Sequence, residues 1–117
     1  MKKKVMISQS MTGLTKDQFV ETQNRFLKFV ESRDFEGVDT LFTDEWYSQE
    51  SLAERGIVHA PLYVLAKVVD RMSLCQGVYF AEGWESDRQC VTEHQIALAY
   101  GLEIIYEDTI NTTHEDI

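Results

Sequence analysis

The chain is poor in cysteine, and its two cysteines belong to no recognisable motif. Cys75 and Cys90 form no C-x-x-C pair and no Cys/His spacing of the kind that binds a metal ion. Both lie in segments with helical patterns. We therefore expect buried, reduced thiols in a cytoplasmic protein, and no metal site.

Long hydrophobic runs are also missing. The opening M-K-K-K-V-M-I-S-Q-S has a basic cluster, but its apolar run V-M-I is too short for the core of a signal peptide. No later segment approaches the length needed to cross a bilayer. We expect neither a secretion leader nor a membrane segment.

Positive charge is scarce. Lys and Arg number 11 against 20 Asp and Glu, which gives a net charge of −9. Such a field repels phosphate backbones, so nucleic acid is not an expected partner. No Lys or Arg follows Arg88, and residues 107–117 are predicted to be a polar, acidic, solvated tail.

What the chain does have is core-forming residues. Hydrophobic residues make up 44% and aromatic residues 11% of the 117 positions, which suits one folded domain spanning residues 1–117. Apolar runs predict strands, and helical periodicity separates them. The predicted strands are residues 4–8, 38–43, 77–81 and 102–107.

Helix signals lie between these strands. Thr15 and Gln18 fit a capping box at the start of the first helix, and Gly37 is expected to close that element. Residues 44–61 are predicted to be a loop with a short helical turn at 49–55. Pro61 suits the first turn of the next helix. The apolar residues expected on the core face of that helix are Leu62, Leu65, Val69 and Met72.

The last predicted helix spans residues 87–100 and is capped by Gly101. Alternation of strands and helices predicts an α/β fold, a single-domain, three-layer sandwich of Rossmann-like or flavodoxin-like type. Its sheet would be mainly parallel, with four or five strands and right-handed crossovers.

Ligands of open parallel sheets bind beyond the carboxyl ends of the strands. Two loops leave predicted strands at that edge: residues 8–13, S-Q-S-M-T-G, and residues 82–88, E-G-W-E-S-D-R. We expect them to lie side by side. Neither matches G-x-G-x-x-G or a P-loop, so dinucleotide or NTPase binding lacks its signature.

The segments V-M-I-S-Q-S-M-T-G and V-Y-F-A-E-G-W-E-S-D-R-Q-C-V-T-E-H-Q-I-A-L-A-Y-G together resemble a known family. They are similar to nucleoside 2-deoxyribosyltransferase-like proteins, which are small and often phage-encoded. The resemblance covers nearly the whole chain and is weakest between residues 44 and 61. It implies a parallel Rossmann-like sheet, a nucleoside or nucleotide ligand and a homo-oligomer.

By this resemblance, Glu93 in E-H-Q-I-A is the nucleophile that attacks C1′ of the sugar and releases the base. A carboxylate can do this through a covalent glycosyl intermediate. No cofactor is implied, because the attacking group is a carboxylate. The alternative is a surface glutamate that favours the helix N-terminus electrostatically. His94 is expected to be structural or solvent-facing rather than a general base.

The two loops supply the expected ligand contacts. Trp84 either stacks on a base or covers the end of the sheet, and Arg88 either holds a 5′-phosphate or pairs with Asp87, Glu85 or Glu82. Gly13 also suits a tight turn. The substrate-binding candidates are Ser8, Gln9, Met11, Thr12, Gly13, Gly83, Trp84, Ser86 and Arg88.

Two departures from the family pattern leave rival functions open. Val69, not Asp70, aligns with the aspartate that assists the leaving base in catalytic relatives. Ser8 and Gln9 replace an aromatic hydroxyl of the first loop. The first prediction is an N-glycosidic hydrolase or deoxyribosyltransferase. The alternatives are a non-catalytic protein that binds a nucleotide or an ADP-ribose-like ligand, and an interaction protein with a vestigial site.

Overall fold

The computed structural model describes residues 2–10, 15–38 and 49–109. Its sheet has the order β2-β1-β3-β4, with all three pairings parallel. The strands are β1 (Lys4–Ser8), β2 (Glu36–Gly37), β3 (Gly77–Phe80) and β4 (Glu103–Tyr106). The predicted α/β fold with a parallel sheet is confirmed, and the described residues contain four of the four or five strands expected.

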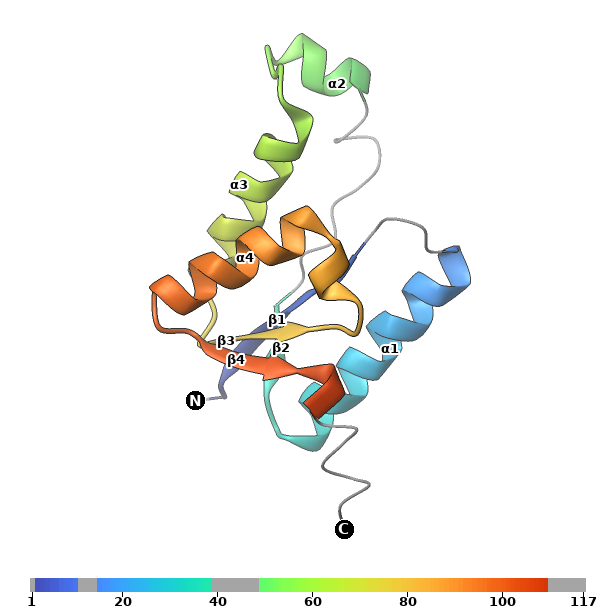
Figure 1. The fold of residues 1–117 in the computed structure, drawn as a ribbon, viewed down its shortest axis with the longest axis vertical. Helices are drawn as coiled ribbons and strands as arrows, with labels where there is room; N and C mark the ends of the chain where they lie inside the picture. The colour runs from blue at the N-terminus through green and yellow to red at the C-terminus, as the bar shows by residue number, and fades with distance from the viewer. Residues whose placement is uncertain (1, 11–14, 39–48, 110–117) are drawn as a thin grey trace.

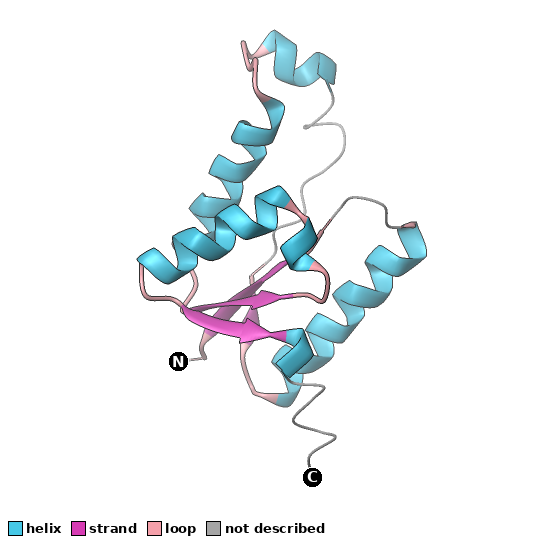
Figure 2. Ribbon diagram, viewed as in Figure 1, coloured by secondary structure: helices cyan, strands magenta, loops and turns pink. Residues whose placement is uncertain are grey.

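Helices cover both faces of this sheet (Figures 1 and 2). The helix α1 (Lys16–Ser32) packs on one face, and α3 (Ala60–Met72) and α4 (Arg88–Ala99) pack on the other. The short helix α2 (Gln49–Glu54) lies beyond the start of α3, away from the sheet (Figure 1). A 3₁₀ turn, η1 (Trp84–Ser86), precedes α4. The result is the expected three-layer sandwich.

The predicted capping box begins α1. The Thr15 hydroxyl accepts from the Gln18 backbone N–H at 3.1 Å, and the Gln18 side chain accepts from the Thr15 N–H at 2.9 Å. The end of α1 differs from the prediction. The helix stops at Ser32, and Asp34 adopts the left-handed conformation with φ 57°. Gly37, expected to close the helix, lies instead in β2.

Two further sequence predictions need correction. The second strand, expected over residues 38–43, occupies Glu36–Gly37, and residues 39–43 lie outside the described part of the chain. The core face of α3 is formed by Val68 and Met72, with Val64 packed beside them. Leu62, predicted to face the core, is 62% exposed, while Leu65 and Val69 are half-buried. The apolar residues of the predicted face and of the observed face both recur at helical spacing, so the sequence pattern could not show which face is buried.

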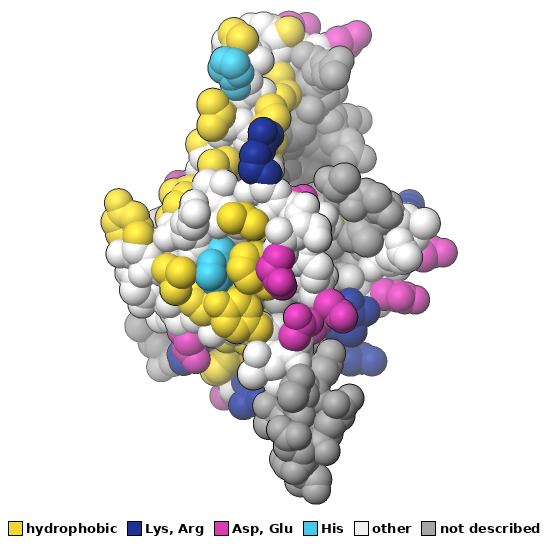
Figure 3. All heavy atoms as spheres, viewed as in Figure 1, with side chains coloured by type: hydrophobic (Ala, Val, Ile, Leu, Met, Phe, Trp, Pro, Cys, Tyr) yellow, Lys and Arg dark blue, Asp and Glu magenta, His cyan; other side chains and the backbone are white. Residues whose placement is uncertain are grey.

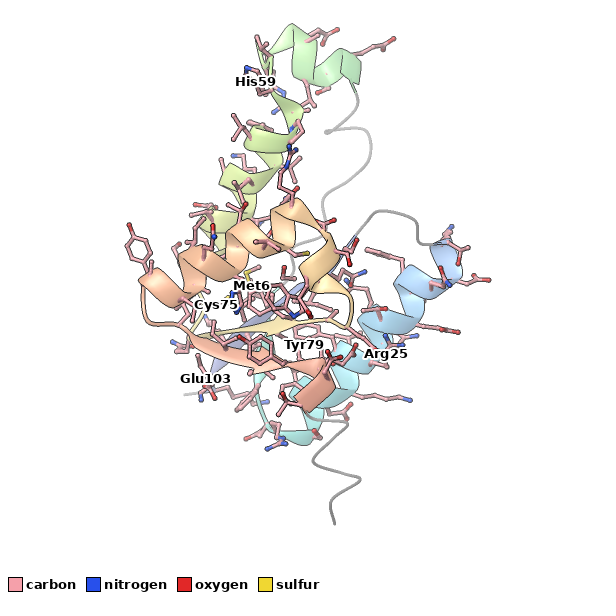
Figure 4. All side chains as sticks on the ribbon, viewed as in Figure 1. Met6, Arg25, His59, Cys75, Tyr79 and Glu103 are labelled. Atoms are coloured by element: carbon pink, nitrogen blue, oxygen red, sulfur yellow. The ribbon has the colours of Figure 1, made fainter. Side chains whose placement is uncertain are left out.

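Side chains of the central strands alternate between two cores. Val5 and Ile7 of β1 face α1, where they join Phe26 and Val30. Met6, labelled in Figure 4, faces α3 and α4 on the other side. Because the strands are parallel and buried on both faces, they read as continuous apolar runs in the sequence.

Both cysteines are free and buried, as predicted. Burial raises the pKa of Cys75 to about 11 and that of Cys90 to about 12, so both remain protonated thiols near neutral pH. Among the described helices, none is long and apolar enough to span a membrane.

The capping box generates a stability prediction. Thr15→Ala removes the acceptor for the Gln18 N–H and should lower the free energy of unfolding by about 1 kcal/mol, measured by urea denaturation. Thr15→Ser keeps the acceptor and should stay close to the wild type. Equal stability of all three proteins would show that the cap does not stabilise α1.

Candidate functional site

The two predicted ligand loops leave neighbouring strands at the same edge of the sheet. Ser8 of β1 lies opposite Phe80 of β3, and the Ala81 N–H donates to the Ser8 carbonyl oxygen at 2.9 Å. Beyond the strands, the Ser10 hydroxyl donates to Asp87 Oδ2 at 3.1 Å. Strand order reverses between β1 and β3, which is where open parallel sheets bind ligands. The described parts of the two loops, residues 8–10 and 82–88, therefore lie side by side as predicted.

Asp87 fixes the start of α4. Its Oδ1 accepts from the backbone N–H groups of Gln89 at 2.9 Å and Cys90 at 3.1 Å. The carboxylate therefore satisfies two of the free N–H groups of the first turn and complements the helix dipole. Upstream, Gly83 adopts a φ of 91°, a backbone conformation that residues other than glycine rarely adopt.

Glu93 lies on the buried face of α4. The spacing of Cys90, Glu93 and Ala97 places all three on one side of the helix, and all three are buried. Glu93 is only 5% exposed, although glutamate is rarely buried unless it is paired. The alternative prediction of a surface glutamate is therefore wrong.

The surroundings of Glu93 favour its neutral form. Burial raises the pKa of Glu93 to about 7; the Ser8 hydroxyl and the Gln89 side chain oppose this shift, and the charge of Asp87 adds to it. Ser8 and Gln89 are close enough to influence the carboxylate but do not form well-aligned hydrogen bonds with it. Ser8 is 2% exposed, and its hydroxyl has no hydrogen-bond partner among the described residues.

An aromatic cluster joins β3, η1, α4 and β4 on the face of the sheet that α3 and α4 cover. Trp84 stacks on His94 with centroids 4.4 Å apart, and the His94 Nε2 atom lies 2.6 Å from the Tyr106 hydroxyl. Phe80 contacts all three rings. Hydrophobic side chains gather over α4 and β4 in Figure 3. His94 thus has the structural contacts expected of it. Trp84 is half-buried and contacts the rings of Phe80, His94 and Tyr106.

The remaining predicted site residues are dispersed. Gln9 turns toward α1, where its Oε1 accepts from Gln23 Nε2 at 2.8 Å. Ser86 and Arg88 are exposed. No ion pair joins Arg88 to another described residue, so the expected pairing with a neighbouring acid is not observed. Met11, Thr12 and Gly13 lie outside the described residues.

The sequence did not point to Glu107, which was placed where the predicted fourth strand, residues 102–107, meets the solvated tail, residues 107–117. This residue follows β4 and is only 3% exposed. Its carboxylate accepts from Tyr79, from Arg25 and from the Glu82 backbone N–H. Tyr79 and Arg25 are labelled in Figure 4, at the end of the sheet beside α1. An acid directly after a strand at the carboxyl edge is the one signal that could have identified it.

No group of three or more His, Cys, Asp or Glu side chains within residues 2–10, 15–38 and 49–109 could hold a metal ion. Comparisons of the chain with models of protein families, with curated proteins and with solved structures found no significant match. The resemblance to deoxyribosyltransferases therefore depends on its residues and motifs alone.

The raised pKa of Glu93 predicts a pH-dependent loss of stability. In the unfolded chain Glu93 ionises near pH 4.3, but in the folded protein only near 7. The free energy of unfolding should therefore fall as the pH rises between these values. Glu93→Gln has no charge to bury, so its advantage over the wild type should grow from near zero at pH 4.5 to about 3 kcal/mol at pH 8.

Urea denaturation at several pH values measures this difference. Glu85→Gln is the matched control, because the Glu85 side chain is exposed and should give no pH-dependent advantage. A constant difference between Glu93→Gln and wild type across the pH range would contradict the burial of an ionisable Glu93.

Proposed function

We propose that the protein cleaves the N-glycosidic bond of a nucleoside, with Glu93 as the nucleophile. One observation carries the proposal: the buried Glu93 carboxylate, which forms no well-formed hydrogen bond with the described residues, lies at the carboxyl edge of the sheet beside the buried Ser8 hydroxyl, which has no hydrogen-bond partner among those residues. Desolvated, unpaired polar groups are costly to stability, and they concentrate at functional sites. The resemblance of the surrounding motifs to deoxyribosyltransferases supports the same assignment.

The reaction follows from the chemistry of the carboxylate. A Glu93 oxygen attacks C1′, and the bond between C1′ and the base nitrogen breaks, with its electron pair leaving on that nitrogen. The departing base takes a proton from water. Water then attacks C1′ of the glycosyl ester and releases the sugar with regeneration of Glu93, or a second base attacks and forms a new nucleoside.

Burial favours this role in two ways. An anion that is poorly solvated by water is a stronger nucleophile than an exposed carboxylate, and a pKa near 7 leaves a substantial ionised fraction at neutral pH.

The charges around the site favour a nucleoside over a nucleotide. Asp87 already occupies the N–H groups of Gln89 and Cys90, so the start of α4 has less to offer a phosphate. Its negative charge, close to Glu93, repels a second anion. Exposed Arg88 is the nearby cation through which a 5′-phosphate would have to bind.

A binding protein is the second candidate, and one observation favours it. Catalytic relatives use an aspartate to assist the departing base. In this chain Val69 occupies the corresponding position, and the acid next to it is Asp70. Asp70 is exposed on α3, and its carboxylate forms no hydrogen bond or ion pair with the described residues. Asp87 is engaged through both of its oxygens. Capture of a nucleoside without turnover would need no such acid.

Base release distinguishes the two functions. The purified protein is incubated with deoxynucleosides and their monophosphates, and free base is measured by chromatography. We expect turnover that is faster with the nucleosides and reduced about 10³-fold or more by Glu93→Gln. If the wild type releases no base while a nucleoside raises its melting temperature, the protein is a binder. If neither occurs, both candidates fail.

The pH profile tests the ionisation state of Glu93. Because the attacking form is the anion, kcat/KM should rise with pH and level off above about 7. Asp87→Asn keeps an oxygen that can cap α4 but removes the charge, so the midpoint of the profile should move to lower pH. A midpoint that stays constant in this variant would exclude Asp87 as a cause of the raised pKa.

A further inference from the structure

Glu107 links three parts of the fold through one buried carboxylate. Its Oε2 accepts from the Tyr79 hydroxyl at 2.6 Å and from Arg25 Nε at 3.1 Å. Its Oε1 accepts from the Glu82 backbone N–H at 2.9 Å. These donors come from β3, from α1 and from the loop that follows β3, so the carboxylate joins the α1 layer to the edge that carries the candidate site.

The network holds Glu107 as an anion. Burial alone would raise the pKa of Glu107, but the hydrogen bonds from Arg25, Tyr79 and the Glu82 N–H outweigh it and lower the pKa. The hydrogen bond to Glu107 in turn raises the pKa of Arg25. Charge-assisted hydrogen bonds of this kind are stronger than neutral ones, so Glu107 is a firm attachment point.

The segment attached to Glu107 leads directly to the site. Glu82 precedes η1 and the Asp87 cap of α4, and its N–H donates to Glu107. Within the segment, the Trp84 N–H donates to the Ala81 carbonyl at 3.1 Å and the Asp87 N–H donates to the Trp84 carbonyl at 3.1 Å. The turn is therefore internally bonded, and Glu107 connects it to a distant part of the chain.

We propose that Glu107 is a positioning residue that holds the 81–87 segment against the sheet and thereby keeps Glu93 shielded from water. The role of the shielded carboxylate rests on the proposed function, whereas the attachment itself does not. Release of Glu82 would loosen η1 and the start of α4, and water would then reach Glu93.

Two substitutions separate the attachment from the rest of the network. Glu107→Leu removes both acceptor oxygens, and Glu107→Gln keeps one oxygen that can still accept from the Glu82 N–H. Hydrogen exchange followed by NMR measures the protection of the Glu82 amide, and a carboxyl titration measures the pKa of Glu93. The leucine variant should exchange the Glu82 amide at least about tenfold faster and titrate Glu93 at a pH about one unit lower or more.

The glutamine variant should restore much of the protection and of the pKa. Tyr79→Phe is the matched control: it removes a donor to Oε2 and lowers stability, but it leaves the bond between Oε1 and Glu82, so both measurements should stay near the wild type. If Glu107→Leu fails to fold, Glu107→Asp takes its place, because the shorter side chain keeps the charge and withdraws the oxygen from Glu82.

Either of two results overturns the proposal. The Glu82 amide could exchange at the wild-type rate without Glu107, or Glu93 could titrate at the wild-type pH although Glu82 has been released. Neither measurement uses turnover, so an inactive wild type would count against the proposed function and leave the test of Glu107 intact.

Discussion

In the sheet, β1 and β3 lie side by side in parallel register, with Ser8 opposite Phe80, and the contacts of the site follow from that pairing. It places two loops at one edge, close enough for Ser10 to donate to Asp87. Alternation along β1 then sends Ser8 toward α4 and Gln9 toward α1. A slip of one residue would exchange those two directions and leave Glu93 facing a longer side chain.

Two buried glutamates at this edge show how hydrogen-bond donors and nearby charges determine the pKa of a buried carboxyl group. Glu93 and Glu107 are about equally hidden from water, at 5% and 3% exposure. Glu107 receives three hydrogen bonds, one from a guanidinium, and remains an anion. Burial raises the pKa of Glu93 and the charge of Asp87 adds to this effect, while the Ser8 and Gln89 side chains oppose it only in part, so Glu93 keeps its proton to higher pH. One glutamate stabilises the fold, and the other costs stability near neutral pH.

Much of the architecture could be predicted because its signals are local. The capping box at Thr15, the strand at Lys4–Ser8 and the cap at Gly101 each depend on residues close together in the chain. The buried face of α3 could not be predicted, because two sets of apolar residues recur at helical spacing. Only the packing of α3 on the sheet determines which set is buried. Glu93 was found through its motif, whereas the donors to Glu107 lie 82, 28 and 25 residues away in the sequence.

The state of the two cysteines has a practical consequence for work with this protein. Both thiols are buried and protonated near neutral pH, so alkylating reagents should react with them slowly. A single cysteine introduced at an exposed position, such as Val58 in the segment between α2 and α3, would then react well ahead of the native ones. A probe could be attached there without replacing either native cysteine, and both cores would remain intact.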